Sequence, residues 1–249
     1  MKFVIYIIVT VLFAGQFTVS AKNKERLEHL IVAGMNIGAT SPGNIPPEVR
    51  KVTAWYPYSS FQLGYNIVYN MNDRWAAGSG ITMDNKGMGV INEVKHLYTE
   101  VRLEADGNYL IGYFSGKNKT DVKMAYITIP FFLRYRLGKQ WRLLSGMYAS
   151  YAHSTSFSGS VWDGYLRTPD PTGLEISIVN REDATFDFGN DMRNFDFGLS
   201  IGGEYRINSR FKVSGIFSRG LTSVLKRDLK FVPFNMYNMY MMFGIAYLL

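Results

Sequence analysis

The feature that most constrains the fold of this chain is an alternation of apolar and polar residues. Between Phe61 and Asn70, every second residue is large and apolar or aromatic, and most of the residues between them are Gln, Gly or Asn. A period of two is typical of a β-strand with one apolar face. The pattern recurs along the chain and predicts eight strands. These cover residues 28–39, 61–70, 75–84, 127–137, 141–152, 195–205, 211–217 and 237–249.

The connections between the predicted strands alternate in length. Three are tight turns near residues 71, 138 and 208. The long connections are residues 40–57, 86–122, 153–193 and 223–235. Short turns on one side and long loops on the other are typical of outer-membrane barrels, in which the turns face the periplasm. With an even number of strands, both mature termini are expected in the periplasm.

The chemistry of the two strand faces favours a barrel in lipid. One face carries large apolar residues and the other carries Gly, Asn, Gln, Ser and Thr, so a mean hydropathy of −0.05 averages two unlike faces. Because lipid cannot pair backbone groups, such a sheet must close. We predict an all-β, eight-stranded antiparallel up-and-down transmembrane β-barrel; the alternative is a soluble lipocalin-like barrel with reversed faces. Aromatic girdle residues are expected at Trp75, Tyr135, Trp141, Tyr205 and Tyr247.

The N-terminal segment has the three parts of a cleaved signal peptide. Lys2 supplies a positive charge, an apolar stretch follows, and small residues lead up to Ala21. We predict a signal peptide over 1–21, a short periplasmic segment over 22–27 and a barrel over 28–249. The absence of cysteine excludes a lipid-modified N-terminal cysteine and a disulfide scaffold. The 27 Lys and Arg against 20 Asp and Glu form no basic cluster, so no nucleic-acid partner is expected.

Several motifs resemble, in order, those of a known family. Residues 126–132, YITIPFF, are similar to the "YxxIP" strand of the outer-membrane β-barrel domain family typical of Bacteroidota, which includes porin-family and PorT-like proteins. Residues 145–148, 196–203 and 218–222 are similar to later strands of that family, although Met147 replaces a proline. The resemblance implies an eight-stranded barrel in the outer membrane of a Gram-negative bacterium. It implies no chemistry, and PorT-like relatives are parts of a secretion machine.

The last predicted strand carries a signal for assembly. Barrel-assembly machinery recognises a C-terminal strand of alternating apolar residues that ends in an aromatic residue. Gly244 and Tyr247 fit this signal, whereas the final residue, Leu249, departs from the expected Phe. The machinery is therefore an expected partner during biogenesis.

An eight-stranded barrel has an interior that side chains fill. We expect Glu204 to pair with Arg134 or Arg136, because buried charges persist only when paired. This predicts a closed lumen; a small pore or a docking surface for an acidic periplasmic partner is the alternative. The predicted lumen charge cluster consists of Arg134, Arg136, Arg142, Glu204, Arg206 and Lys212.

Enzymatic activity is not expected. His153, followed by Ser154 and with Asp163 or Asp170 as an acid, is the one arrangement that suggests a lipid-modifying hydrolase. A base must lie within hydrogen-bond reach of its nucleophile, and the sequence does not establish this. We expect no metal and no cofactor, because the three histidines are scattered and the carboxylates lack calcium-loop spacing.

Two long loops contain further patterns. Residues 94–103 and 109–114 alternate around an Asp-Gly turn and are expected to extend the barrel as a hairpin above the membrane. A ten-stranded barrel is the alternative, although residues such as Glu93 and Lys95 are unfavourable against lipid. A possible extracellular contact patch, or a lid over the barrel mouth, consists of Phe157, Trp162, Tyr165 and Leu166.

These observations predict a non-enzymatic barrel with a structural or interaction role. It is expected to be a subunit of, or accessory to, an outer-membrane complex for secretion, barrel assembly or uptake. The expected partners are outer-membrane lipid and lipopolysaccharide, the barrel-assembly machinery, and other outer-membrane or periplasmic proteins.

Overall fold

The structure is a computed structural model that describes residues 26–105, 107–226 and 234–249. In this part of the chain, no helix is long and apolar enough to cross a membrane. The predicted signal peptide, residues 1–21, lies outside the described residues. The elements are β1 (Leu27–Pro42), β2 (Val49–Pro57), β3 (Ser60–Asn70), β4 (Trp75–Leu103), β5 (Tyr109–Arg136), β6 (Trp141–Thr168), β7 (Leu174–Ile178), β8 (Ala184–Asp187), the 3-10 helix η1 (Gly189–Asp191), β9 (Phe195–Arg206), β10 (Phe211–Gly220) and β11 (Met236–Leu248).

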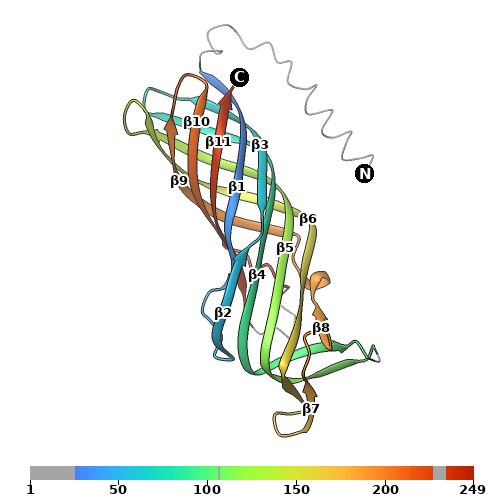
Figure 1. Cartoon of the computed structure of the whole chain (residues 1–249). Helices are drawn as coiled ribbons and strands as arrows, with labels where there is room; N and C mark the ends of the chain where they lie inside the picture. Colours follow the sequence, from blue (N-terminus) through green and yellow to red (C-terminus); the bar gives the residue numbers. More distant parts are fainter. Residues whose placement is uncertain (1–25, 106, 227–233) are drawn as a thin grey trace, which may run out of the picture.

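Eight of the strands form a closed antiparallel ring in the order β1, β3, β4, β5, β6, β9, β10, β11. β11 pairs back on β1, from Leu30 opposite Leu248 to Pro42 opposite Met236. The prediction of eight strands in the ring is therefore confirmed, as are the three short turns, and the ten-strand alternative is wrong. The C-terminus and the start of β1 lie at one end of the ring, here called the terminal end (Figure 1). The opposite end is the distal end.

The outward face of the ring carries the large apolar residues. Phe61 and Met147 are 61% and 59% exposed, whereas Leu30 and Val68 point inward and are buried. Aromatic rings also pair across neighbouring strands beside each short turn of the terminal end, at the level of the predicted girdle. With ring centroids 4.7, 4.9 and 5.2 Å apart, these pairs are Trp75 with Tyr135, Trp141 with Tyr205, and Phe211 with Tyr247.

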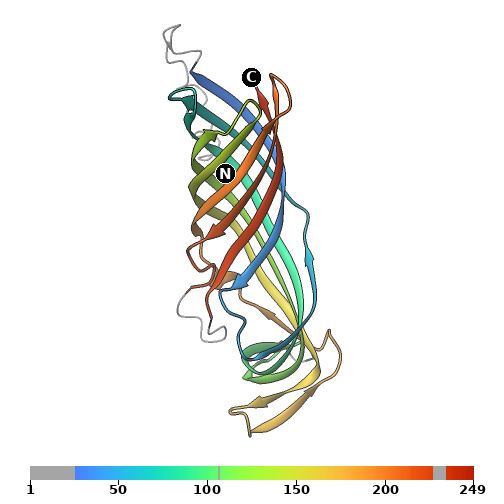
Figure 2. The same ribbon diagram turned by 90° about the vertical axis from the view of Figure 1, so that its left-hand side faces the viewer.

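Three strands continue far beyond the distal end. β4, β5 and β6 contain 29, 28 and 28 residues, whereas crossing a membrane takes about 9–11. Their continuation, residues 87–103, 109–125 and 153–168, forms with β2, β7 and β8 a structure that we call the extension (Figures 1 and 2).

The extension corrects three predicted loops. Most of 86–122 and 153–193 is strand, and 40–57 contains β2. The predicted hairpin beyond the barrel is confirmed, since β4 pairs with β5 out to Arg102 opposite Tyr109. Its charged side chains are unfavourable against lipid but compatible with a strand in water. The fourth predicted loop, 223–235, lies partly outside the described residues.

The extension bends at one level of its three long strands. His96 in β4, Gly116 in β5 and Asp163 in β6 have φ angles of 55°, 154° and 50°. Register shifts occur at the same places in the β4–β5 and β5–β6 pairs. Extra residues in a bulge bend a strand. Across the bend, Lys117 Nζ lies 2.8 Å from the Asp163 carboxylate, whose hydrogen bond and charge raise the pKa of Lys117.

The bend closes a second, smaller ring. Beyond the bend, the end of β4 lies beside β8 and pairs with it, with Arg102 opposite Thr185. β8 also pairs with β6, from Ser158 opposite Asp187 to Val161 opposite Ala184. β4, β5, β6 and β8 therefore pair in a circuit, which stabilises the tip of the extension.

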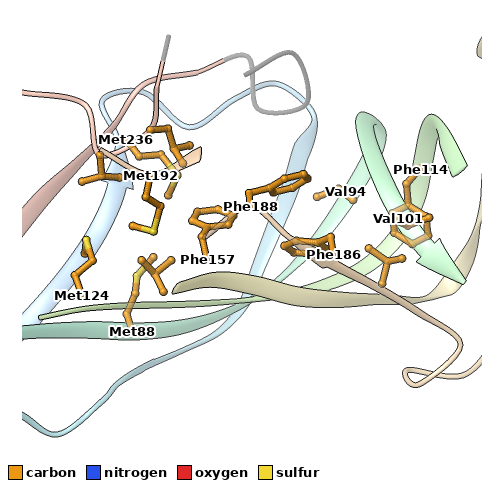
Figure 3. Close-up of a cluster of buried hydrophobic side chains, with 14 of the residues drawn as sticks. Met88, Val94, Val101, Phe114, Met124, Phe157, Phe186, Phe188, Met192 and Met236 are labelled. Carbon is orange, nitrogen blue, oxygen red and sulfur yellow. The ribbon is translucent and has the colours of Figure 1, made fainter. Parts of the chain in front are cut away.

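An apolar core fills the side of the extension that continues from the barrel interior. Figure 3 shows Phe157, Phe186 and Phe188 together between a group of methionines and a group that includes Val101 and Phe114. The ring centroids of Phe186 and Phe188 lie 5.5 Å apart. The extension thus has its own core and is not a set of solvated loops.

Replacing Gly116 by alanine is expected to destabilise the extension by about 1–3 kcal/mol. A Cβ at this position would lie 2.7 Å from the Phe114 ring and 2.8 Å from Gly164 Cα, at a φ that L-residues rarely adopt. Limited proteolysis should show faster cleavage within the extension. The control is Gly138→Ala, in a turn where an added Cβ would have no heavy atom within 4 Å, and equal cleavage of the two variants would contradict this prediction.

Candidate functional site

The first group of buried charges lies inside the terminal end of the ring. We call it the terminal cluster, and its members come from five strands. Arg134 lies between two acids, with nitrogen–oxygen distances of 2.9 Å to Glu28 and 3.1 Å to Glu204. Arg142 lies 3.2 Å from the other oxygen of Glu204. Lys212 Nζ lies 2.6 Å from Glu28 and 3.9 Å from Glu204.

Four of the five members of the terminal cluster are buried, and Glu28 is half-buried. Arg134, Arg142, Glu204 and Lys212 are buried, and the Lys212 side chain is 2% exposed. Desolvated charges of both signs, each within reach of a partner, form a charge-paired cluster and not a free cationic surface. Three cations against two carboxylates leave this cluster with an excess positive charge.

The structure brings together only part of the predicted cluster. Arg134, Arg142 and Glu204 meet, whereas Arg136 is exposed at the end of β5. Arg206 is half-buried and donates from Nε to the Asn208 carbonyl oxygen, 3.1 Å away. These two side chains lie where the strands end, so they reach solvent instead of the interior.

Glu28 is the member that sequence reasoning missed. It stands at even spacing from the inward residues Leu30 and Val32 of β1. That parity could have placed it inside the ring. Its position at the first residue of the predicted strand concealed this, because strand ends are the least reliable part of such patterns.

The second group of buried charges lies near the distal end, around a single lysine. Lys86 Nζ lies 3.4 Å from Asp84 and 4.0 Å from Asp196. It also lies 4.9 to 5.8 Å from the centres of three tyrosine rings, a geometry that gives cation–π attraction. We call this group the lysine cage; it consists of Lys86, Asp84, Asp196, Tyr126, Tyr148 and Tyr240.

Hydrogen bonds fix the acids of the lysine cage. Asp196 accepts bonds from the Tyr148 hydroxyl at 3.2 Å, from Asn238 Nδ2 at 2.9 Å and from the Thr222 hydroxyl at 3.0 Å. Asp84 accepts one from Asn36. Every charge in this group is paired, and three tyrosine rings surround the ammonium group inside the distal part of the ring.

A small cavity separates the two groups. It has a volume of about 120 Å³, enough for several water molecules, and is lined by residues of both groups, including Lys86, Asp84, Arg134 and Glu204. Arg134 Nε and Asn66 Oδ1 are buried and have no hydrogen-bond partner within the described residues. The interior therefore holds two clusters of buried charges, with a small cavity of mixed apolar and polar lining between them.

The predicted contact patch is divided between two faces of β6. Phe157 and Leu166 are 5% and 0% exposed and belong to the core of the extension, which corrects their assignment to a contact surface. Trp162 and Tyr165 are half-buried on the other face, under the guanidinium groups of Arg181 and Arg167. Because these residues lie in a strand and not in a loop, successive side chains point to opposite faces, so the four predicted residues cannot form one patch.

The residues of the C-terminal signal lie on the last strand of the ring and at its end. Gly244 lies opposite Gly34 of β1, and a Cβ there would meet the Ala33 carbonyl oxygen at 2.8 Å. Tyr247 packs on Phe211 and accepts a bond of 3.3 Å from Arg210. Leu249 is exposed at the chain end.

The arrangement that suggested a hydrolase is dispersed. His153 is exposed on β6, whereas Asp163 is paired with Lys117 and Asp170 accepts bonds from Thr172. Both acids are thus engaged elsewhere. In residues 26–105, 107–226 and 234–249, no group of three or more His, Cys, Asp or Glu residues could hold a metal ion.

A closed antiparallel ring with an apolar outside and a polar, charge-paired inside defines the class of membrane-spanning β-barrels. The sequence matches the profile of the outer membrane protein beta-barrel domain over residues 15–226, so the chain belongs to this family. It is an outer-membrane β-barrel protein. The finer resemblance to Bacteroidota-type and PorT-like members stays a prediction.

Among solved structures, the chain is similar to Ail, the attachment invasion locus protein of Yersinia pestis. The crystal structure of Ail in complex with the heparin analogue sucrose octasulfate has 10% identity and a TM-score of 0.43, over 90% of this chain and 99% of Ail. The backbone structure of Ail in a phospholipid bilayer nanodisc has 13% identity and a TM-score of 0.35, over 89% and 99%. No curated protein matches the sequence.

Proposed function

We propose that this protein is a largely closed, non-enzymatic outer-membrane barrel with a structural or interaction role. The observation that carries the proposal is the pair of buried charge clusters, the terminal cluster and the lysine cage. A solute would have to pass both, and each consists of side chains held by several strands. Such an interior suits a scaffold better than a channel.

The long extension supports an interaction role. An eight-stranded barrel needs no folded structure of this size to be stable in a membrane, and loops and their equivalents are where barrels carry function. In the proposed topology, the three short turns and both mature termini face the periplasm and the extension faces outward. The protein would serve as a subunit of, or accessory to, a complex for secretion, barrel assembly or uptake. Its origin would be a Gram-negative bacterium of the Bacteroidota.

Planar-bilayer recording tests the closed lumen. The purified barrel is expected to give no stable single-channel steps, because both clusters are anchored by buried ion pairs. A commonly used open porin in the same bilayer serves as the positive control. Reproducible steps from the unmodified protein would contradict the proposal and favour the small pore.

Two further measurements test the remaining parts of the proposal. After gentle extraction, native electrophoresis is expected to show the protein in a complex larger than one barrel, and a lone monomer would contradict the subunit role.

Lipid A mass spectra are expected to be the same for cells that overexpress the protein and for cells that overexpress His153→Ala. A mass change that depends on His153 would indicate an enzyme.

A further inference from the structure

A polar cleft lies in the extension, away from both clusters of buried charges. Its volume is about 620 Å³. Its walls are the tip of the β4–β5 hairpin, adjacent stretches of β5 and β6, and β8 with its neighbouring residues. Lys119 and Asp121 line the cleft, whereas the next inward residues of β5, Thr120 and Val122, are buried on the opposite face. The cleft thus lies mainly on the polar face of these strands, and the core residues Phe186 and Phe188 also line it.

The charges of the cleft are balanced. It contains three bases and three acids together with the hydroxyls of Ser158, Ser160 and Thr185. One base and one acid, Lys119 and Asp121, pair directly at 2.7 Å. A strongly acidic or strongly basic ligand would therefore meet as much repulsion as attraction. The six charged residues are Glu100, Arg102, Lys119, Asp121, Arg181 and Asp187.

One wall of the cleft presents a planar group that its neighbours hold in place. Arg181 donates from Nε to the Ser160 hydroxyl at 3.3 Å, and its guanidinium carbon lies 4.7 Å from the centre of the Trp162 ring. Of its five N–H donors, this contact uses one. Tyr109 also lines the cleft; it is 65% exposed and lies opposite Arg102 in the β4–β5 pair.

Most of the backbone around the cleft is already paired. β4 pairs with β5, β5 with β6 and β6 with β8, and β8 pairs with the end of β4 at Arg102 and Leu103. A peptide that adds a strand needs an open edge. Recognition in this cleft therefore depends on side chains.

From this geometry we infer that the cleft binds a neutral oligosaccharide. A sugar hydroxyl both donates and accepts hydrogen bonds, which matches a wall where guanidinium donors, carboxylate acceptors and hydroxyls alternate. The exposed Tyr109 ring offers apolar surface for the C–H face of a pyranose. The inference concerns the extension and is independent of whether the lumen is closed.

The test is a binding measurement on the full barrel in a detergent without a sugar headgroup. The probes are an array of neutral hexose oligosaccharides, and the neutral oligosaccharides released from the lipopolysaccharide of the bacterium that makes the protein. Retention of array members only points to an outside glycan, and retention of the released sugars points to the cell's own surface. Arg102→Ala and Tyr109→Ala are each expected to weaken binding about tenfold, as loss of a charged hydrogen bond or a ring contact does.

Arg50→Ala is the matched control, because Arg50 is exposed on β2 of the same extension and does not line the cleft. It should leave affinity unchanged. Retention of neither probe set would overturn the inference. So would equal binding by Arg102→Ala, Tyr109→Ala and the unmodified protein. A planar-bilayer result of either kind leaves this outcome unaffected.

Discussion

Replacing Glu204 by alanine is expected to lower the free energy of unfolding by about 3–5 kcal/mol, the cost of breaking a buried ion pair. The change leaves Arg134, Arg142 and Lys212 with Glu28 as the only remaining carboxylate of the terminal cluster. Arg142 loses the one acid within 4 Å that the structure shows for it among the described residues. Urea unfolding in lipid vesicles, followed by the fluorescence of the four tryptophans, measures the loss.

Two comparisons separate lost charge pairing from general disturbance. Glu182→Ala, in an exposed turn before β8, is expected to change stability by less than about 0.5 kcal/mol. Adding Arg142→Met to Glu204→Ala removes a cation that has lost its carboxylate partner. The free energy of unfolding of the double variant should therefore fall by less than the sum of the two single losses. A Glu204→Ala protein as stable as Glu182→Ala would show that the ion pairs contribute nothing.

The ring is predictable because each of its strands has one face toward lipid and one toward a narrow interior. From Phe61 to Asn70 this gives unbroken alternation, and parity alone places Arg134 and Glu204 inside. The three tight turns also follow, since strand ends on that side are only a few residues apart. Wherever the chain crosses the membrane, the need for one lipid-facing side and one inward-facing side appears directly in the sequence as alternation.

The extension is harder to predict because its strands have no lipid face. Both faces of β2 are largely exposed, so its sequence has no regular alternation of apolar and polar residues. Its large apolar residues Val52 and Trp55, for example, are both exposed. At the bend, His96 and Gly116 lie where the pairing registers shift, which reverses the parity of the residues that follow. Lys86 comes before the bend, but the predicted strand ends at Asp84, so Lys86 falls in a predicted loop and the lysine cage is concealed, although Asp84 and Asp196 stand on predicted inward faces.

Replacing Lys86 by methionine is expected to cost about 3–5 kcal/mol, although methionine fills a similar volume. The ammonium group is the cation nearest to Asp84 and Asp196, whose side chains are 8% and 3% exposed. It also interacts with the rings of the cage, which methionine would contact without a charge. The same urea unfolding measures the loss, with the exposed Lys51→Met on β2 as a control expected to change little.

Loss of Lys86 should destabilise the two carboxylates of the lysine cage to different extents, which makes the prediction specific. Asp196 keeps three donors, Tyr148, Asn238 and Thr222, after the lysine is gone. For Asp84, the described residues supply only the side chain of Asn36 as a remaining donor. Adding Asp84→Asn to Lys86→Met removes the poorly supported charge and should restore much of the stability. Adding Asp196→Asn should restore less, because an amide would direct its N–H groups at existing donors. Equal recovery by the two changes would mean that Lys86 does not act through Asp84.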